Sequence, residues 1–402
     1  MSKKSWIKPH HKTVRNIANV LFGPIVKLKY NVRPEKFDVS GKKAYLILYN
    51  HQTPFDQFFV GISFDLPIYY VATEDIFSNG LVSDLIRGLV APIPIAKGTN
   101  DAGSILKCIR VAREGGTLAI APEGNRTYSG RTEHISESVI PLARKLGLPV
   151  LLYRIEGGYG KNPRWSDKVR GGKMRAYVHS VITPEEYREM TDEEFFSAVK
   201  EGLYVDENRD TGVYRSNRRA EYLERAIYYC PFCGLSEFES KRNKAVCKKC
   251  GRAVEYGVDK KLRGVGFDFP YGYFGEWYDA QNEFVRSLNT DGYLASPLYR
   301  DKADVYEVEL FKRKKPLYRS AGIALYADRI TVNEGGDDPV VIPFDSVSAV
   351  TVLGRNKLNV YTEKTVYQIR GGKRFNAVKY INFYYLYNNR KKDGNDGEFL
   401  GL

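Results

Sequence analysis

Ala44-Tyr45-Leu46-Ile47-Leu48-Tyr49 is a run of six apolar and aromatic residues that leads directly into Asn50-His51-Gln52-Thr53-Pro54-Phe55-Asp56. A short apolar run that ends in a proline-containing turn is typical of a buried strand passing into a helix. Open α/β folds bind their ligands at the carboxyl ends of such strands. We therefore expect His51 and Asp56 to lie at the ligand-binding edge of a sheet.

The His51 turn has two interpretations. An imidazole can take a proton from an alcohol near neutral pH, and a nearby carboxylate such as Asp56 fixes its tautomer and stabilises its cation. The same residues also spell a helix start, with the Thr53 hydroxyl as a cap, Pro54 at the first helical position and an acid two residues later. The turn alone does not decide between a catalytic pair and a capped helix.

A second charged turn follows the apolar run 117–121 and reads Pro122-Glu123-Gly124-Asn125-Arg126-Thr127. By itself it could be a turn with an ion pair. Together with the first turn it forms an ordered pattern, His-four residues-Asp followed about seventy residues later by Pro-Glu-Gly-x-Arg, that resembles the glycerolipid acyltransferase family, which includes the 1-acylglycerol-3-phosphate acyltransferases. The resemblance covers roughly residues 10–190, with weaker matches at 91–97 and 148–152.

The resemblance implies a catalytic role for the first turn. His51 matches the general base that deprotonates the acceptor hydroxyl, and Asp56 matches its orienting partner. The sequence has no Ser or Cys in a Gly-x-Ser-x-Gly nucleophile elbow, so we expect direct attack on an acyl thioester rather than a covalent acyl-enzyme.

The second turn matches the acceptor-binding motif of the same family. Glu123 and Arg126 match its acceptor-binding pair, and Gly124 lets the backbone approach the ligand. The planar guanidinium of Arg126 can engage two phosphate oxygens, and Lys97 would add a point charge. Lys97 stands where the family usually carries Arg, and Asn125 replaces a small hydroxyl residue.

The basic composition predicts attraction to anionic surfaces. The chain of 402 residues has 62 Lys and Arg against 48 Asp and Glu, a net charge of +14. Anionic lipid and nucleic acid are the two common partners of such a surface. No apolar stretch approaches the ~20 residues that span a bilayer, and the basic N-terminus lacks a hydrophobic signal core. We expect a cytoplasmic protein, peripheral on the inner face of the cell membrane.

The N-terminal segment has apolar residues at helical spacing, flanked by basic ones. The apolar positions are Val14, Ile17, Ala18, Leu21, Ile25 and Leu28. This helix could lie flat on a membrane. The alternative is an ordinary amphipathic helix that packs on the domain and is interrupted at Gly23-Pro24.

Four of the five cysteines form two C-x-x-C pairs, Cys230 with Cys233 and Cys247 with Cys250. Four thiolates at this spacing predict a tetrahedral zinc site with no position left for substrate, so the zinc would be structural. The alternative, two disulfides, is disfavoured because nothing marks the chain for export. Zinc ribbons also bind nucleic acids, but no RNA-stacking motif accompanies this one, so a nucleic-acid partner is not favoured.

The last hundred residues change to short β runs. Seven runs are predicted, at 305–311, 322–326, 329–332, 340–343, 347–353, 357–361 and 365–370. One amphipathic helix, predicted from Phe375 to Tyr387, follows them. Strands closed by a single terminal helix resemble a pleckstrin-homology-like (PH-like) barrel plugged by that helix.

These features predict an α/β acyltransferase domain with a central mixed sheet flanked by helices, a small zinc ribbon and a C-terminal PH-like β-barrel capped by one helix. The expected ranges are 1–220 for the acyltransferase domain with its N-terminal amphipathic helix, 221–258 for the ribbon, 259–300 for a connecting segment, 301–390 for the barrel and 391–402 for a disordered tail.

The expected function is transfer of a fatty acyl group from acyl-CoA or acyl carrier protein (acyl-ACP) to the free hydroxyl of 1-acylglycerol 3-phosphate, which yields phosphatidate in phospholipid biosynthesis. The alternatives are an acyltransferase for another lysophospholipid acceptor, a noncatalytic lipid-binding scaffold and, less favoured, a nucleic-acid binder.

Overall fold

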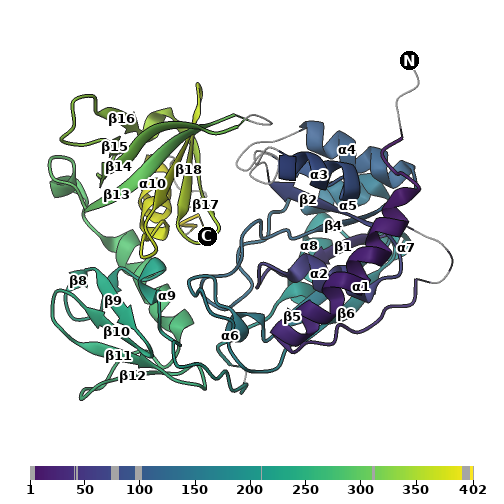
Figure 1. Ribbon diagram of the computed structural model, residues 1–402, viewed down its shortest axis with the longest axis horizontal. Helices are drawn as coiled ribbons and strands as arrows, with labels where there is room; N and C mark the ends of the chain where they lie inside the picture. Colours follow the sequence, from purple (N-terminus) through teal and green to yellow (C-terminus); the bar gives the residue numbers. More distant parts are fainter. Residues whose placement is uncertain are drawn as a thin grey trace. The chain divides into compact units, whose positions relative to one another are not determined.

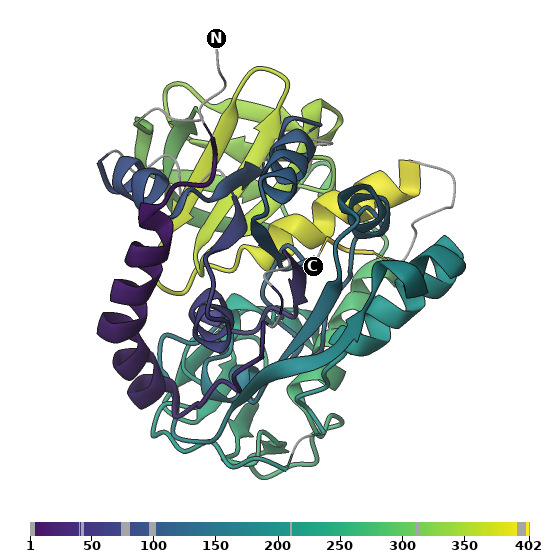
Figure 2. The same cartoon turned by 90° about the vertical axis from the view of Figure 1, so that its right-hand side faces the viewer.

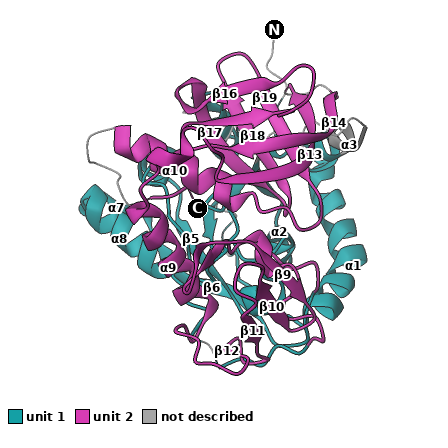
Figure 3. Cartoon of the chain, turned by 90° about the vertical axis from the view of Figure 1, so that its left-hand side faces the viewer, with its two compact units in different colours: residues 1–163, 169–215 teal, residues 164–168, 216–402 magenta. Residues whose placement is uncertain are grey.

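The computed structural model describes residues 5–39, 41, 44–73, 81–95, 102–209, 211–309, 313–391 and 399–401 (Figure 1). The chain divides into two compact units (Figure 3). Unit 1 comprises residues 1–163 and 169–215, and unit 2 comprises residues 164–168 and 216–402. The boundary at 215 lies close to the predicted one at 220, but the assignment of 164–168 to unit 2 was not predicted from the sequence.

Unit 1 is built on a six-stranded sheet of order β3-β2-β4-β1-β5-β6. The strands are β1 (Leu46–Tyr49), β2 (Ile68–Thr73), β3 (Ile93–Ile95), β4 (Thr117–Ile120), β5 (Val150–Glu156) and β6 (Arg175–Ile182). Strands β1 to β5 pair in parallel, whereas β6 is antiparallel to β5. The sheet is therefore mixed, as predicted.

Helices cover both faces of this sheet (Figure 2). They are α1 (His10–Tyr30), α2 (Asp56–Ser63), α3 (Leu81–Val90), α4 (Ala102–Arg113), α5 (Val139–Leu146), α6 (Gly158–Lys161), α7 (Pro184–Glu189) and α8 (Asp192–Leu203). Side chains alternate along β1, so Leu46 and Leu48 share a core with α4, α5 and α8. Ile47 faces the opposite way, into the core shared with α1 and α2. Both faces of β1 are thus buried, which explains its uninterrupted apolar run.

Helix α1 runs without a break through Pro24, so the interruption at Gly23-Pro24 does not occur. Proline removes one helical N–H and leaves the carbonyl four residues earlier without a partner. That residue is Val20, which lies on the exposed side of the helix. The helix ends at Asn31, whose φ of 48° is left-handed.

The first part of unit 2 is a small ribbon of short strands. These are β7 (Tyr229–Cys230), β8 (Gly234–Leu235), β9 (Phe238–Lys241), β10 (Lys244–Cys247), β11 (Ala253–Tyr256) and β12 (Leu262–Gly264). Strands β9 to β12 form an antiparallel sheet, and β7 pairs with β8. The short helix η2 (Leu223–Arg225) precedes the ribbon and α9 (Phe274–Ser287) follows it. Trp165, fully buried, packs against Tyr256 and Phe274, which explains why 164–168 belongs to this unit.

The second part of unit 2 is a seven-stranded antiparallel sheet of order β16-β15-β14-β13-β19-β18-β17. Its strands are β13 (Tyr299–Val308), β14 (Lys315–Leu325), β15 (Arg329–Val332), β16 (Val340–Pro343), β17 (Val347–Leu353), β18 (Lys357–Thr362) and β19 (Val366–Gly371). Short helices η3 (Asp291–Tyr293) and η4 (Phe344–Ser346) lie before β13 and β17. Among the described residues the end strands β16 and β17 do not pair, so the sheet is a curled half-barrel.

Helix α10 (Val378–Lys391) follows the sheet and buries Val378, Ile381 and Phe383. It packs on β17 and α9. The predicted disordered tail begins at 391, and its residues 392–398 and 402 lie outside the described residues. Leu400 is buried, and its carbonyl accepts from Asn382 Nδ2 at 2.8 Å, so the stretch 399–401 returns to α10.

Candidate active site

The His51–Asp56 pair lies in the turn after β1, where the parallel strand ends. His51 Nδ1 is 2.7 Å from Asp56 Oδ2. Asp56 is fully buried, whereas 24 % of the His51 side chain is exposed. A carboxylate can only accept, so the shared proton sits on Nδ1 and leaves Nε2 as the basic nitrogen.

The Asp56 carboxylate is held by the turn itself. Its Oδ2 accepts from Gln52 N at 2.7 Å and from Thr53 N at 3.0 Å. Its Oδ1 accepts from the Thr53 hydroxyl at 2.6 Å. These bonds fix the direction of the carboxylate and therefore that of the imidazole ring.

The alternative reading of this turn, a helix capped by Thr53, differs from the observed geometry. Helix α2 begins at Asp56, and its N-cap residue, Phe55, makes no side-chain cap hydrogen bond. The Thr53 hydroxyl accepts from Phe55 N at 3.1 Å and donates to Asp56. The polar residues of the turn thus converge on the carboxylate that contacts His51.

The residues on either side of His51 are anchored to β5 and α6. Asn50 donates from Nδ2 to Ile155 O at 2.9 Å and accepts at Oδ1 from Ile155 N at 2.7 Å. Gln52 Oε1 accepts from Tyr159 N at 3.2 Å. His51 is therefore presented from a backbone that is fixed at both neighbours.

The turn after β4 meets the His51 turn through two hydrogen bonds to the His51 main chain. His51 N donates to Glu123 Oε1 at 2.7 Å, and Thr127 N donates to His51 O at 3.0 Å. The second carboxylate oxygen of Glu123 accepts from Glu133 N at 2.7 Å. Gly124 has φ of 65°, a conformation that glycine adopts without strain, and it makes the sharp bend of this turn.

Burial raises the pKa of Glu123 to about 8, against the lowering effect of its two backbone N–H donors. The nearby Glu133 and Asp56 carboxylates also raise this pKa. The site therefore favours the neutral form of Glu123 more than water does.

Of the remaining predicted acceptor-binding residues, Arg126 lies in the described part and Lys97 lies outside it. Arg126 follows Glu123 and Gly124 in the same turn and is 8 % exposed. It immediately precedes Thr127, which contacts His51. The sequence-predicted roles of these residues in acceptor binding stay predictions.

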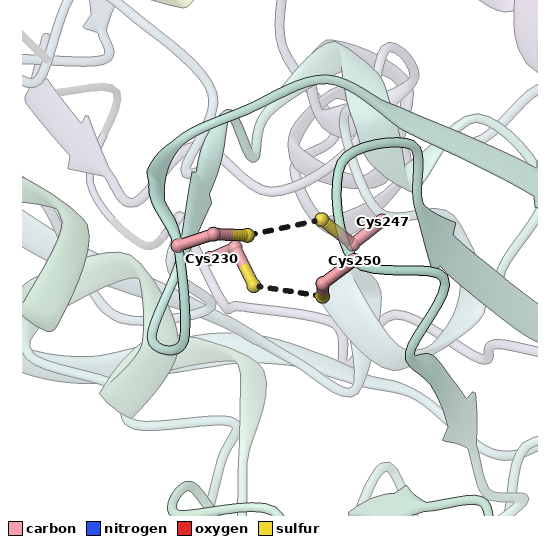
Figure 4. A group of neighbouring side chains, drawn as sticks. Cys230, Cys247 and Cys250 are labelled. Carbon is pink, nitrogen blue, oxygen red and sulfur yellow. Dashed lines mark hydrogen bonds between the residues drawn. The ribbon is translucent and has the colours of Figure 1, made fainter.

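The thiols of Cys230, Cys247 and Cys250 in the ribbon point toward one another (Figure 4), and the Cys233 thiol belongs to the same cluster. All five cysteines lie in the described part of the chain, and all are free thiols. The Sγ atoms of the ribbon cysteines lie within 4.8 Å of one another. Cys230 and Cys250 are 3.8 Å apart, and Cys233 and Cys247 are 3.5 Å apart, too far for disulfides.

These distances fit a tetrahedral metal site. Zinc–sulfur bonds of about 2.3 Å give sulfur–sulfur edges of about 3.8 Å in a tetrahedron. Gly234 and Gly251, which follow the two C-x-x-C pairs, have φ of 70° and 73°, so each turn bends back around the site. The fifth cysteine, Cys108, is buried in α4, and burial raises its pKa to about 11, as expected of a core thiol.

Sequence reasoning missed three residues that shape the His51 site. Asn50 and Gln52 anchor the turn, and Glu133 joins Glu123 to the loop after Arg126. Asn50 and Gln52 flank the histidine and could have been singled out as polar residues after a buried strand. Glu133 stands outside both motifs, and nothing in the sequence marks it.

Comparison with known proteins matches residues 26–155 to the Acyltransferase family. This range holds both turns of the site. A curated relative, the 1-acyl-sn-glycerol-3-phosphate acyltransferase of Borreliella burgdorferi, is 24 % identical over 170 residues, which cover 41 % of this chain and 67 % of the relative.

Two solved structures show weaker likeness. The 1-acyl-sn-glycerophosphate acyltransferase PlsC of Thermotoga maritima has a TM-score of 0.40 at 20 % identity, covering 48 % of this chain and 76 % of that one. The N-terminal PH domain of human ARAP2 has a TM-score of 0.21 at 14 % identity, covering 27 % and 91 %. Both TM-scores are too low to establish a shared fold. The family match carries the conclusion that this chain contains an acyltransferase-family domain and is an acyltransferase.

Proposed function

We propose that this acyltransferase moves a fatty acyl group from acyl-CoA or acyl-ACP to the free hydroxyl of 1-acylglycerol 3-phosphate, forming phosphatidate. The observation that carries the proposal is the buried Asp56 held against a partly exposed His51 at the end of a parallel strand. The Borreliella relative, a 1-acyl-sn-glycerol-3-phosphate acyltransferase, supports this choice of acceptor.

The reaction needs one base and no covalent intermediate. His51 Nε2 takes the hydroxyl proton as the hydroxyl oxygen attacks the thioester carbonyl carbon. The tetrahedral intermediate then expels the thiolate, which receives the proton from His51. Asp56 stabilises the imidazolium that exists between these steps.

Arg126, with Lys97, is proposed to bind the acceptor phosphate, because a guanidinium pairs with two phosphate oxygens at once. Zinc is proposed in the ribbon, held by Cys230, Cys233, Cys247 and Cys250, and it would act as a structural crosslink. The curled sheet with α10 is proposed to be PH-like, which its strand order and single terminal helix support.

The test is mass-spectrometric detection of phosphatidate after lysophosphatidate is supplied with acyl-CoA or acyl-ACP. Wild-type protein should form the product, and His51→Ala should lower the rate by about 10²- to 10⁴-fold, the usual contribution of a general base. Product from wild type at the same rate as from His51→Ala would contradict the mechanism. Absence of product with either donor, from folded protein, would exclude this acceptor.

Helix α1 is proposed to be the surface of the protein that contacts the membrane. None of the helices within the described residues is long and apolar enough to cross a bilayer. Instead, α1 exposes apolar side chains that form one stripe at helical spacing, Ile17, Val20, Leu21, Ile25 and Leu28. Exposed lysines flank them, at Lys12, Lys27 and Lys29. Apolar insertion with lysines at anionic headgroups is the usual way in which a helix lies on a bilayer.

Sedimentation with vesicles containing anionic lipid tests this surface. Leu28→Asp should reduce the bound fraction, because it places a negative charge in the apolar stripe, whereas Leu106→Asp should not. Leu106 is the matched control, since it is an exposed leucine on α4, 66 % exposed against 85 % for Leu28. Equal binding of the two variants would remove α1 from the membrane contact.

A further inference from the structure

Glu133 makes an unusual number of hydrogen bonds to one short loop. Its Oε1 accepts from the Thr127 hydroxyl at 2.9 Å, Tyr128 N at 3.1 Å, Ser129 N at 3.1 Å and the Ser129 hydroxyl at 2.9 Å. All three of these partners are 1 % exposed. Four buried donors on one carboxylate oxygen indicate a loop whose shape is set by that carboxylate.

The backbone of Glu133 extends these contacts to the His51 turn. Glu133 N donates to Glu123 Oε2, and Glu123 Oε1 accepts from His51 N. Thr127 N in turn donates to His51 O. The bonds form a closed circuit through Glu133, Glu123, His51 and Thr127, with Arg126 on the segment between two of its members.

We propose that Glu133 is a positioning residue that holds the His51 turn and the Arg126 turn in one geometry. The inference rests on the proposed function for its substrate, lysophosphatidate, but the circuit itself is independent of any substrate. Glu133 affects the reaction by fixing the loops that carry His51 and Arg126. It need not touch the acceptor.

A solvated surface acid would not have these contacts. Glu137, four residues later, is exposed, and its backbone carbonyl accepts from Ile140 N at 3.0 Å. Glu133, by contrast, is the acceptor for buried N–H and O–H groups that lose their partner if the side chain is removed. Glu137→Gln is therefore a matched control for Glu133→Gln.

The kinetic test compares Glu133→Gln and Glu133→Ala with Glu137→Gln in steady-state assays at varied acceptor and varied donor. A displacement of reacting groups by about 1 Å costs about 100-fold in rate. We expect Glu133→Ala to lower kcat/KM for lysophosphatidate by about 10- to 100-fold while the KM for the acyl donor stays within about twofold. Glu133→Gln keeps an amide oxygen as acceptor and should recover part of the loss.

A second readout does not depend on the acceptor. The imidazole resonances of His51, assigned by their absence in His51→Ala, should shift in both Glu133 variants and remain in place in Glu137→Gln. Unshifted resonances in folded Glu133→Gln would overturn the proposal. So would losses of equal size for acceptor and donor that simply follow a loss of thermal stability. If wild type proves inactive on lysophosphatidate, the proposed function fails, and the resonance shift still decides the role of Glu133.

Discussion

The His51 turn and the cysteine ribbon hold their polar groups in different ways. In unit 1, Asp56 and Glu123 are fixed by backbone N–H groups of turns that extend from a sheet buried on both faces. In unit 2, four thiols from two short loops, next to strands of two to four residues, converge until their Sγ atoms lie within 4.8 Å of one another. A large apolar core can support a precise site on its own, whereas a small ribbon needs an added crosslink, which the proposed zinc would supply.

Removal of the metal should have the largest effect. It should unfold the ribbon of unit 2 and leave the His51 site of unit 1 intact. Zinc binding contributes roughly 10–16 kcal/mol in small zinc domains, more than the few short strands of the ribbon can replace. Slow chelation should therefore unfold the ribbon, seen as loss of amide protection from hydrogen exchange in residues 229–256. The rate of acyl transfer should persist while this occurs.

Cysteine variants give the matched control. Cys230→Ser should bind less than one zinc per chain by elemental analysis, and Cys108→Ala should retain one, because Cys108 lies in the α4 core away from the cluster. Full zinc content in Cys230→Ser would show that the four thiols are not the ligands. Loss of acyl transfer in step with zinc would show that the two regions are coupled.

The sequence predicted much of the architecture, because β1 is apolar on both faces and the strands of the C-terminal sheet are short runs separated by turns. The predicted strand near 44–49 is β1, and the predicted runs 329–332 and 347–353 coincide with β15 and β17. The continuity of α1 through Pro24 was not predicted, because a proline inside a helix removes a hydrogen bond and favours a break.

The individual contacts of the site were predictable from local spacing only where its residues are neighbours in sequence. His51 and Asp56 are five residues apart, so their spacing alone places them on one turn. The bonds from Asn50 to Ile155 and from His51 to Glu123 span 105 and 72 residues. They follow from the order of β4, β1 and β5 in the sheet, which local patterns do not report. Glu133 depends on these same long-range bonds and could be found only in the structure.

The smallest expected effect is on the pH dependence of stability. It sharpens the comparison by showing what a buried carboxyl, in place of a metal, does to the free energy of unfolding. Burial raises the pKa of Glu123 from 4.5 to about 8, so the folded state binds this proton more tightly than the unfolded state. The resulting stabilisation is complete below pH 4.5 and is lost as the pH rises to about 8. Wild type should thus lose stability over this window, by an amount of the order of a few kcal/mol.

Glu123→Gln stays neutral and should lose less over the same window, measured as the free energy of unfolding from urea melts at pH 5 and pH 8. The amide nitrogen introduced by Glu123→Gln cannot accept one of the two N–H bonds that the Glu123 carboxyl accepts. This loss is the same at pH 5 and pH 8, so it cancels when the two free energies of unfolding are subtracted. Exposed Glu137→Gln is the control, and an equal pH slope in wild type and Glu123→Gln would show that Glu123 is ionised throughout.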